Sequence, residues 1–229
     1  MAACFVKICG VKSVDHAIAA ARAGADMIGF VFVAKSPRAI APDVASDIVT
    51  EIKQLAYEEG FAPPKFCGLF IDAGERLLGE TAPFLSHFQF HGHEDAERVD
   101  EIRSAFGLEI IKAVNVAPET DFGDLAPLAE AADMLLFDAR PPRGAVLPGG
   151  NGLAFDWSAL RRYQGETPFL LAGGLNAGNV AAAIKTVGGH TAFSGVDVSS
   201  GVETGPGEKN SELIETFIKT AKAAAADGV

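Results

Sequence analysis

The stretch "FVKICGVKSVDHAIAAARAGADMIGFVF", residues 5–32, contains the unit from which the fold can be predicted. Two short, mostly apolar runs at 5–9 and 27–32 flank an alanine-rich segment over 13–25. Ser13 stands where a helix N-cap is expected. Runs that are apolar on both faces are typical of strands in a parallel sheet, which is covered on both sides. The stretch therefore predicts a strand, a helix and a second, parallel strand.

The same alternation recurs along the rest of the chain, where short apolar runs are separated by amphipathic or alanine-rich segments. The predicted strands cover residues 5–9, 27–32, 65–70, 87–91, 108–114, 133–139, 168–174 and 191–198. The clearest predicted helices cover residues 13–25, 42–59, 95–107 and 176–189. The candidate caps are Ser13, Asp43 and Asn176 at helix starts and Gly24, Gly60, Gly107 and Gly188 at helix ends.

Eight strand and helix units in 229 residues predict an α/β protein with one (β/α)8 barrel, the TIM barrel, over residues 1–229 as a single domain. An open, doubly wound sheet is the alternative, but such a sheet usually has five or six strands. In a TIM barrel the chemistry lies at the C-terminal ends of the strands. The long segment 140–155 follows one of these ends, and a loop of this length is often a functional lid.

Composition excludes several classes of protein. The formal charge of -11 disfavours nucleic acid and anionic membranes as partners. No apolar run approaches the roughly 18 residues of a membrane span, and the N-terminus has no signal-peptide pattern, so a cytoplasmic protein is expected. Cys4, Cys9 and Cys67 are an odd number without metal-like spacing, which argues against a disulfide framework or a zinc ribbon.

Two titratable residues end predicted strands. Cys9 is the last residue of the first strand, at or just below the barrel mouth, although a buried structural cysteine is the alternative there. Asp138 follows the apolar run "MLLF", and burial would raise its pKa so that it holds a proton near neutral pH. A helix cap or an ion pair with Arg140 is the alternative for Asp138. For Cys4 and Cys67 a structural role is expected.

The segments "LAGGLN" and "DVSSGVE" follow the last two strands. Their glycines allow backbone N–H groups to approach a ligand closely, and the loops after strands seven and eight often form a phosphate site in this fold. Simple turns are the alternative. The candidate phosphate-binding residues are Gly173, Gly174, Val198, Ser199 and Ser200.

Three further features have more than one interpretation. Arg38, after the turn "KSP", suits a planar carboxylate. His91 and His93 raise the question of zinc, but no third ligand has suitable spacing, and a hydrogen-bonding role for His91 is favoured. Lys112 offers a Schiff-base amine, as in aldolases, or an amine that extends to the strand end.

In order along the chain, the sequence contains "KICG", "GFVF" with "KSPR", "CGLF", "QFHG", "FDA", "GGNGLAFDW", "LAGGLN" and "DVSSGVE" with "PGEK". This ordered set resembles the motifs of the phosphoribosylanthranilate isomerase family of tryptophan biosynthesis, from Lys7 to Lys209. Asn151, where many relatives have a hydroxyl residue, and Phe90, where leucine is common, depart from the pattern. Both leave Cys9 and Asp138 unchanged.

The resemblance implies an Amadori rearrangement of phosphoribosylanthranilate to 1-(2-carboxyphenylamino)-1-deoxyribulose 5-phosphate, without cofactor or metal. It implies that Cys9 is the general base, Asp138 the general acid and Arg38 the contact for the anthranilate carboxylate. It also implies that the candidate phosphate residues bind the phosphate of this small anionic phosphosugar. Lys7, Asp197 and His91 are expected to support the site, and Lys7 to lower the pKa of Cys9.

The expected assembly is a monomer or a homodimer, with neither nucleic acid nor a membrane as partner. Alternatives from the sequence are a related phosphate-binding barrel enzyme, such as the histidine-pathway sugar isomerase or indole-glycerol-phosphate synthase, an aldolase that uses Lys112, and a phosphosugar-binding barrel without activity. The histidine-pathway enzyme is expected to have an aspartate where Cys9 stands.

Overall fold

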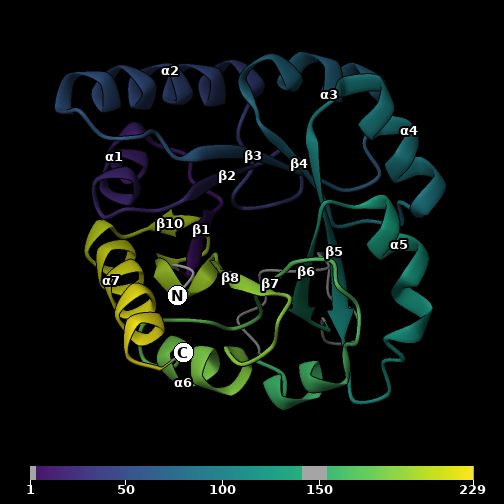
Figure 1. The fold of residues 1–229 in the computed structure, drawn as a ribbon. Helices are drawn as coiled ribbons and strands as arrows, with labels where there is room; N and C mark the ends of the chain where they lie inside the picture. Colours follow the sequence, from purple (N-terminus) through teal and green to yellow (C-terminus); the bar gives the residue numbers. More distant parts are fainter. Residues whose placement is uncertain (1–3, 141–153, 229) are drawn as a thin grey trace.

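The computed structural model describes residues 4–140 and 154–228. Its eight parallel strands pair in chain order and close into a barrel, so the predicted (β/α)8 architecture is confirmed and the open sheet is excluded. Figure 1 shows this ring of strands surrounded by helices. The strands are β1 (Phe5–Cys9), β2 (Met27–Val31), β3 (Lys65–Phe70), β4 (His87–Phe90), β5 (Glu109–Val116), β6 (Met134–Ala139), β7 (Phe169–Leu171) and β8 (Phe193–Val198).

Helices cover the outside of the barrel, and the last of them, α7, packs against both α1 and α6, next to the first strand (Figure 1). The α-helices are α1 (Val14–Arg22), α2 (Pro42–Glu59), α3 (Glu75–Thr81), α4 (Ala96–Phe106), α5 (Ala126–Ala131), α6 (Val180–Val187) and α7 (Ser211–Gly228). The short 3-10 helices are η1 (Ala82–Phe84), η2 (Gly123–Leu125), η3 (Trp157–Arg162) and η4 (Ser200–Val202). A two-stranded ribbon, β9 (Glu203–Gly205) with β10 (Glu208–Lys209), follows η4.

The predicted helix ends are partly right. Ser13 caps α1 and accepts a hydrogen bond from the backbone N–H of His16, and Gly60 and Gly107 end α2 and α4 in the left-handed conformation. The other two N-caps are wrong. Ala41 precedes α2, because Pro42 begins the helix and places Asp43 in its first turn. Asn179 rather than Asn176 precedes α6.

Side chains alternate between the barrel interior and the helical layer because successive residues of a strand point to opposite faces. A small apolar cluster that includes Met27, Cys67, Ile111 and Leu136 fills the interior, and the larger core lies between strands and helices. Above the small cluster, several inward positions near the C-terminal strand ends are polar, among them Cys9, Asp138 and Asp197. Across the described part of the chain, no helix combines the length and apolar character that crossing a lipid bilayer requires.

Candidate active site

Cys9 is the last residue of β1 and faces the barrel interior, where its side chain is buried. A Cβ atom added at neighbouring Gly29 would lie 3.2 Å from its Sγ atom and 3.3 Å from Nζ of Lys7. Because Gly29 has no side chain, the Cys9 thiol and the Lys7 ammonium group have room to lie next to each other. Burial raises the pKa of the Cys9 thiol, and the opposing charge of Lys7 only partly offsets this. The expectation of a lowered thiol pKa is wrong, because desolvation outweighs the cation.

Lys7 and Asp197 form an ion pair inside the barrel. They are register partners on β1 and β8, and Nζ of Lys7 donates to Oδ1 of Asp197 at 2.6 Å. Burial alone would lower the pKa of Lys7, but the negative charge of Asp197, with that of the thiolates of Cys9 and Cys67, raises it. Lys7 is therefore a permanent cation directly below the Cys9 thiol.

Asp138 lies near the end of β6 and also faces the interior, with its side chain buried. The backbone N–H of Ala139 donates to its Oδ1 atom at 2.8 Å. Burial raises the pKa of Asp138 to about 7, and this hydrogen bond opposes the rise. The charges of Lys7 and Asp197 act on both Asp138 and Cys9. The two candidate catalytic groups therefore share one barrel interior, and Asp138 is available as an acid near neutral pH.

The interior next to Asp138 contains buried polar atoms that form no hydrogen bond of good geometry within the described residues, although the side chains of His91 and Asn115 interact with each other. They are Oε1 of Gln89 on β4, Nε2 of His91 directly after β4, and Oδ1 of Asn115 on β5. All three lie at inward positions. Nε2 of His91 lies 3.7 Å from Oδ2 of Asp138, and burial lowers the pKa of His91 to about 4, so this contact is not an ion pair at neutral pH. Unpaired buried polar atoms indicate a missing partner. A ligand with several hydroxyl groups would supply one.

The raised pKa of Asp138 predicts a pH-dependent penalty on stability. The unfolded chain releases this proton near pH 4 and the native protein near pH 7, so stability falls across this interval as pH rises. Asp138→Asn retains the shape without the charge. We expect its unfolding free energy, relative to wild type, to increase by roughly 2–3 kcal/mol between pH 5 and pH 8. Urea unfolding of both proteins at the two pH values measures this, and a constant difference would contradict the buried acid.

The loops after β7 and β8 lie side by side, as the predicted phosphate site would require. Gly173 and Gly174 have positive φ angles of 81° and 64°. A Cβ atom at Gly173 would lie 2.7 Å from the backbone nitrogen of Ala139, and one at Gly201 would overlap the carbonyl oxygen of Leu175. Val198 ends β8, Ser199 precedes η4, and Ser200 is the first residue of η4. β7 ends at Leu171, so the two glycines belong to the loop rather than to the predicted strand.

Arg38 lies at the rim in a charged network that spans three loops. Its Nε and Nη2 atoms donate to the two carboxylate oxygens of Glu203, each at 2.8 Å. Lys209 donates to Glu203 at 2.6 Å and to the carbonyl oxygen of Ser199 at 2.9 Å, and the Ser199 hydroxyl donates to the carbonyl oxygen of Cys9. Two cations, Arg38 and Lys209, therefore share the Glu203 carboxylate. The sequence offers no local signal for the role of Glu203, because 165 positions separate it from Arg38.

Other sequence-based candidates lie away from this interior. Lys112 is on the outer face of β5, where its ammonium group pairs with Glu94, which gives no support to a Schiff-base role. His93 is exposed and bonds Asp72, and within residues 4–140 and 154–228 no group of three His, Cys, Asp or Glu side chains could hold a metal ion. Asn151 and most of the proposed lid at 140–155 lie outside the described residues.

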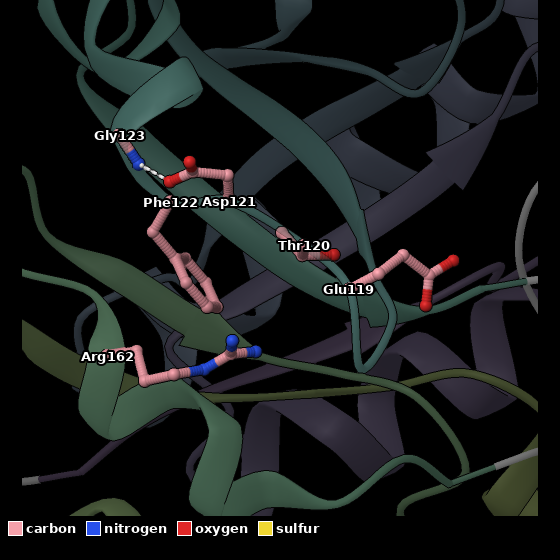
Figure 2. Close-up of a pocket in the computed structure, with 6 residues that line it drawn as sticks. All are labelled: Glu119, Thr120, Asp121, Phe122, Gly123 and Arg162. Atoms are coloured by element: carbon pink, nitrogen blue, oxygen red, sulfur yellow. Dashed lines mark hydrogen bonds between the residues drawn. The ribbon is translucent and has the colours of Figure 1, made fainter.

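Two cavities lie beside the barrel rim. One of about 350 Å³ is formed by the loop 119–123 and Arg162 (Figure 2), whose guanidinium group lies over the ring of Phe122. The other, of about 700 Å³, reaches Ala139 and Arg140 at the end of β6. None of the predicted site residues lines either cavity. Acidic side chains and arginines both line these cavities, so their charge alone does not favour or exclude an anionic ligand.

Comparisons with known proteins show which family the chain resembles. The family model described as "N-(5'phosphoribosyl)anthranilate (PRA) isomerase" matches residues 6–220. The N-(5'-phosphoribosyl)anthranilate isomerase of Rhodopseudomonas palustris (strain BisB5) is 44% identical over 220 residues, which cover 95% of each chain.

Solved structures give the same result. A phosphoribosyl anthranilate isomerase in complex with reduced 1-(o-carboxyphenylamino)-1-deoxyribulose 5-phosphate superimposes with a TM-score of 0.76 at 32% identity, covering 96% of this chain and 99% of the other. A structure of monomers generated from the dimeric phosphoribosylanthranilate isomerase of Thermotoga maritima gives a TM-score of 0.73 at 31% identity, with the same coverage.

Proposed function

The chain belongs to the N-(5'-phosphoribosyl)anthranilate isomerase family, and we propose that Cys9 and Asp138 carry out its aldose to ketose rearrangement by general acid and base catalysis. The observation that carries the proposal is the position of both groups at C-terminal strand ends, facing the same barrel interior. The enzyme is an isomerase, and tryptophan biosynthesis is the pathway that the family serves.

In the first step, Asp138 donates its proton to the furanose ring oxygen. The C1′–O bond breaks, the lone pair of the anthranilate nitrogen forms the C1′=N bond, and an open-chain Schiff base with a positive nitrogen results. A carboxyl group with a pKa of about 7 is suited to this step, because a large share of it holds a proton at neutral pH. The nearby Nε2 atom of neutral His91 can accept a hydrogen bond from a sugar hydroxyl.

In the second step, the Cys9 thiolate removes the proton from C2′. The electron pair of the C–H bond forms the C1′=C2′ bond, and the Schiff-base nitrogen becomes neutral. The enolamine then tautomerises to the 2-ketose. The charge of Lys7 stabilises the thiolate, while burial keeps that thiolate strongly basic once it forms.

The substrate's two anionic ends are assigned to the rim. We propose that Gly173, Gly174, Val198, Ser199 and Ser200 surround the phosphate, with backbone N–H groups as donors. Arg38, held in orientation by Glu203, attracts the anthranilate carboxylate. Arg38 and Lys209 place two cations at the rim of a protein whose formal net charge is -11.

Turnover of phosphoribosylanthranilate by the purified protein tests the function. The expected result is a loss of anthranilate-type fluorescence with formation of the aminoketose, and no metal in the assay. An absence of turnover by folded protein, as judged by circular dichroism, would overturn the assignment.

The two pKa values predict the pH dependence of this activity. The reaction needs thiolate with protonated carboxyl, but Asp138 loses its proton near pH 7 and Cys9 above its ordinary value of about 8.5. When Cys9 and Asp138 hold one proton between them, the proton is mostly on Cys9. The active form, with the proton on Asp138, is then a minor but constant share of the singly protonated enzyme. We expect kcat/KM to rise about tenfold from pH 6 to pH 8 and to fall only above the ordinary pKa of a cysteine. A maximum at or below pH 6 would contradict these assignments.

We further propose that residues 1–229 act as one catalytic domain, as a monomer or homodimer, in the cytoplasm. A reducing compartment suits an enzyme whose three cysteines are all free. Light scattering distinguishes the two assemblies.

A further inference from the structure

A buried ion pair lies directly behind His91, on the other side of the barrel wall. Nζ of Lys112, on the outward face of β5, lies 3.0 Å from Oε2 of Glu94 in the loop after β4. Both side chains are only 4% exposed. A buried pair of this kind has a high desolvation cost and is weak evidence for stability, so its position calls for a separate explanation.

Lys112 and Glu94 form hydrogen bonds with the backbone of the residues before and after His91. Lys112 donates to the carbonyl oxygen of Gly92 at 2.8 Å and, at 3.5 Å, to that of Phe90. Glu94 accepts from the backbone N–H of Gly92 at 2.9 Å. The residues before and after His91 are thus attached to one rigid charged group.

Glu94 also extends this attachment to the loop after β3. Its Oε1 atom accepts from the backbone N–H of Asp72 at 2.7 Å, and Asp72 has the left-handed φ angle of 48°. A Cβ atom at Gly92 would lie 2.5 Å from Oδ1 of Asp72, so only glycine fits the close approach of the two loops. The ends of β3, β4 and β5 are therefore held together around His91.

We propose that Lys112 and Glu94 are positioning residues that hold the His91 imidazole against the Asp138 carboxyl, and so place the acid for ring opening. Neither residue touches the barrel interior. The inference rests on the proposed function for its effect on turnover, whereas its effect on the His91 ring is independent of the substrate. The ammonium charge of Lys112 also disfavours a proton on His91, which is consistent with the lowered pKa of that histidine.

The test compares Glu94→Gln with the matched control Glu80→Gln, which removes a carboxylate from the exposed ion pair with Arg76 on α3. For Glu94→Gln we expect kcat to fall about tenfold to hundredfold with little change in KM, because displacement near the reacting groups slows chemistry more than binding. We also expect the 1H and 15N chemical shifts of the His91 ring to move, assigned with His91→Asn. Glu80→Gln should leave both unchanged.

A second variant provides the test if Glu94→Gln does not fold. Lys112→Met/Glu94→Gln leaves no unpaired charge in the buried site, and the same drop in kcat and the same shift of His91 resonances are expected. Wild-type kcat and wild-type His91 resonances in a folded variant of either kind would overturn the proposal. Absence of turnover in the wild type would instead overturn the proposed function, and the resonances would still test the positioning role.

Discussion

Cys9→Ser and Asp138→Asn should each lower kcat by about 10²–10⁴-fold, the usual contribution of one general acid or base. Both replacements keep the approximate shape of the side chain. Serine is too weakly acidic to supply the base, and asparagine has no proton to deliver to the ring oxygen. Steady-state kinetics measures the loss. Because the phosphate loops are unaltered, the affinity for the aminoketose product should change little.

Cys67→Ala is the matched control for the first of these variants. Cys67 is also an inward-facing, fully buried cysteine, but it lies in the apolar cluster below the site. We expect some loss of stability from the smaller side chain and wild-type kcat. Activity of Cys9→Ser or Asp138→Asn equal to that of wild type would remove the corresponding residue from the mechanism.

Lys7→Met should cause a large loss of stability. It leaves the Asp197 carboxylate buried without its cation, and breaking a buried pair in this way costs about 3–5 kcal/mol. Asp197→Asn leaves Lys7 uncompensated and should cost a similar amount. The double variant Lys7→Met/Asp197→Asn should regain most of the loss, because no buried charge remains. Urea unfolding of the four proteins measures the coupling.

The exposed pair of Lys219 and Glu215 on α7 provides the comparison for this cycle. Lys219→Met should change the unfolding free energy far less than Lys7→Met, because solvent screens the exposed charges. Equal losses at the two positions, or losses in the double variant that are the sum of the single ones, would contradict strong coupling inside the barrel.

The sequence predicts the strand ends well because hydrophobic pattern and turn residues agree there. β1 and β3 have the predicted bounds, and Cys9 and Asp138 could be placed at the barrel mouth from the order of the strands alone. Prediction is poorer where local sequence does not decide the structure. β7 is shorter than its apolar run, because Gly173 and Gly174 take positive φ angles that leave the strand conformation.

The remaining features depend on contacts between distant residues. Neither the bond of Arg38 to Glu203 nor that of Lys112 to Glu94 has a local signal in the sequence. The sequence identifies Lys7 as a cation near Cys9, but it does not show how deeply the thiol is buried. The direction of the Cys9 pKa shift depends on that burial, whose effect is larger than that of Lys7. The position of Lys112 depends on the register of β5, because successive residues of a strand point to opposite faces. A shift of one residue would direct its amine into the barrel.

A kinetic isotope effect with substrate deuterated at C2′ tests most directly that sulfur and carboxyl act on one sugar from facing walls. In Cys9→Ser, removal of this proton becomes limiting, so we expect a full primary isotope effect on the residual turnover. In Asp138→Asn, ring opening is limiting and the effect should be absent. A primary effect in Asp138→Asn together with none in Cys9→Ser would contradict the assignment of base and acid.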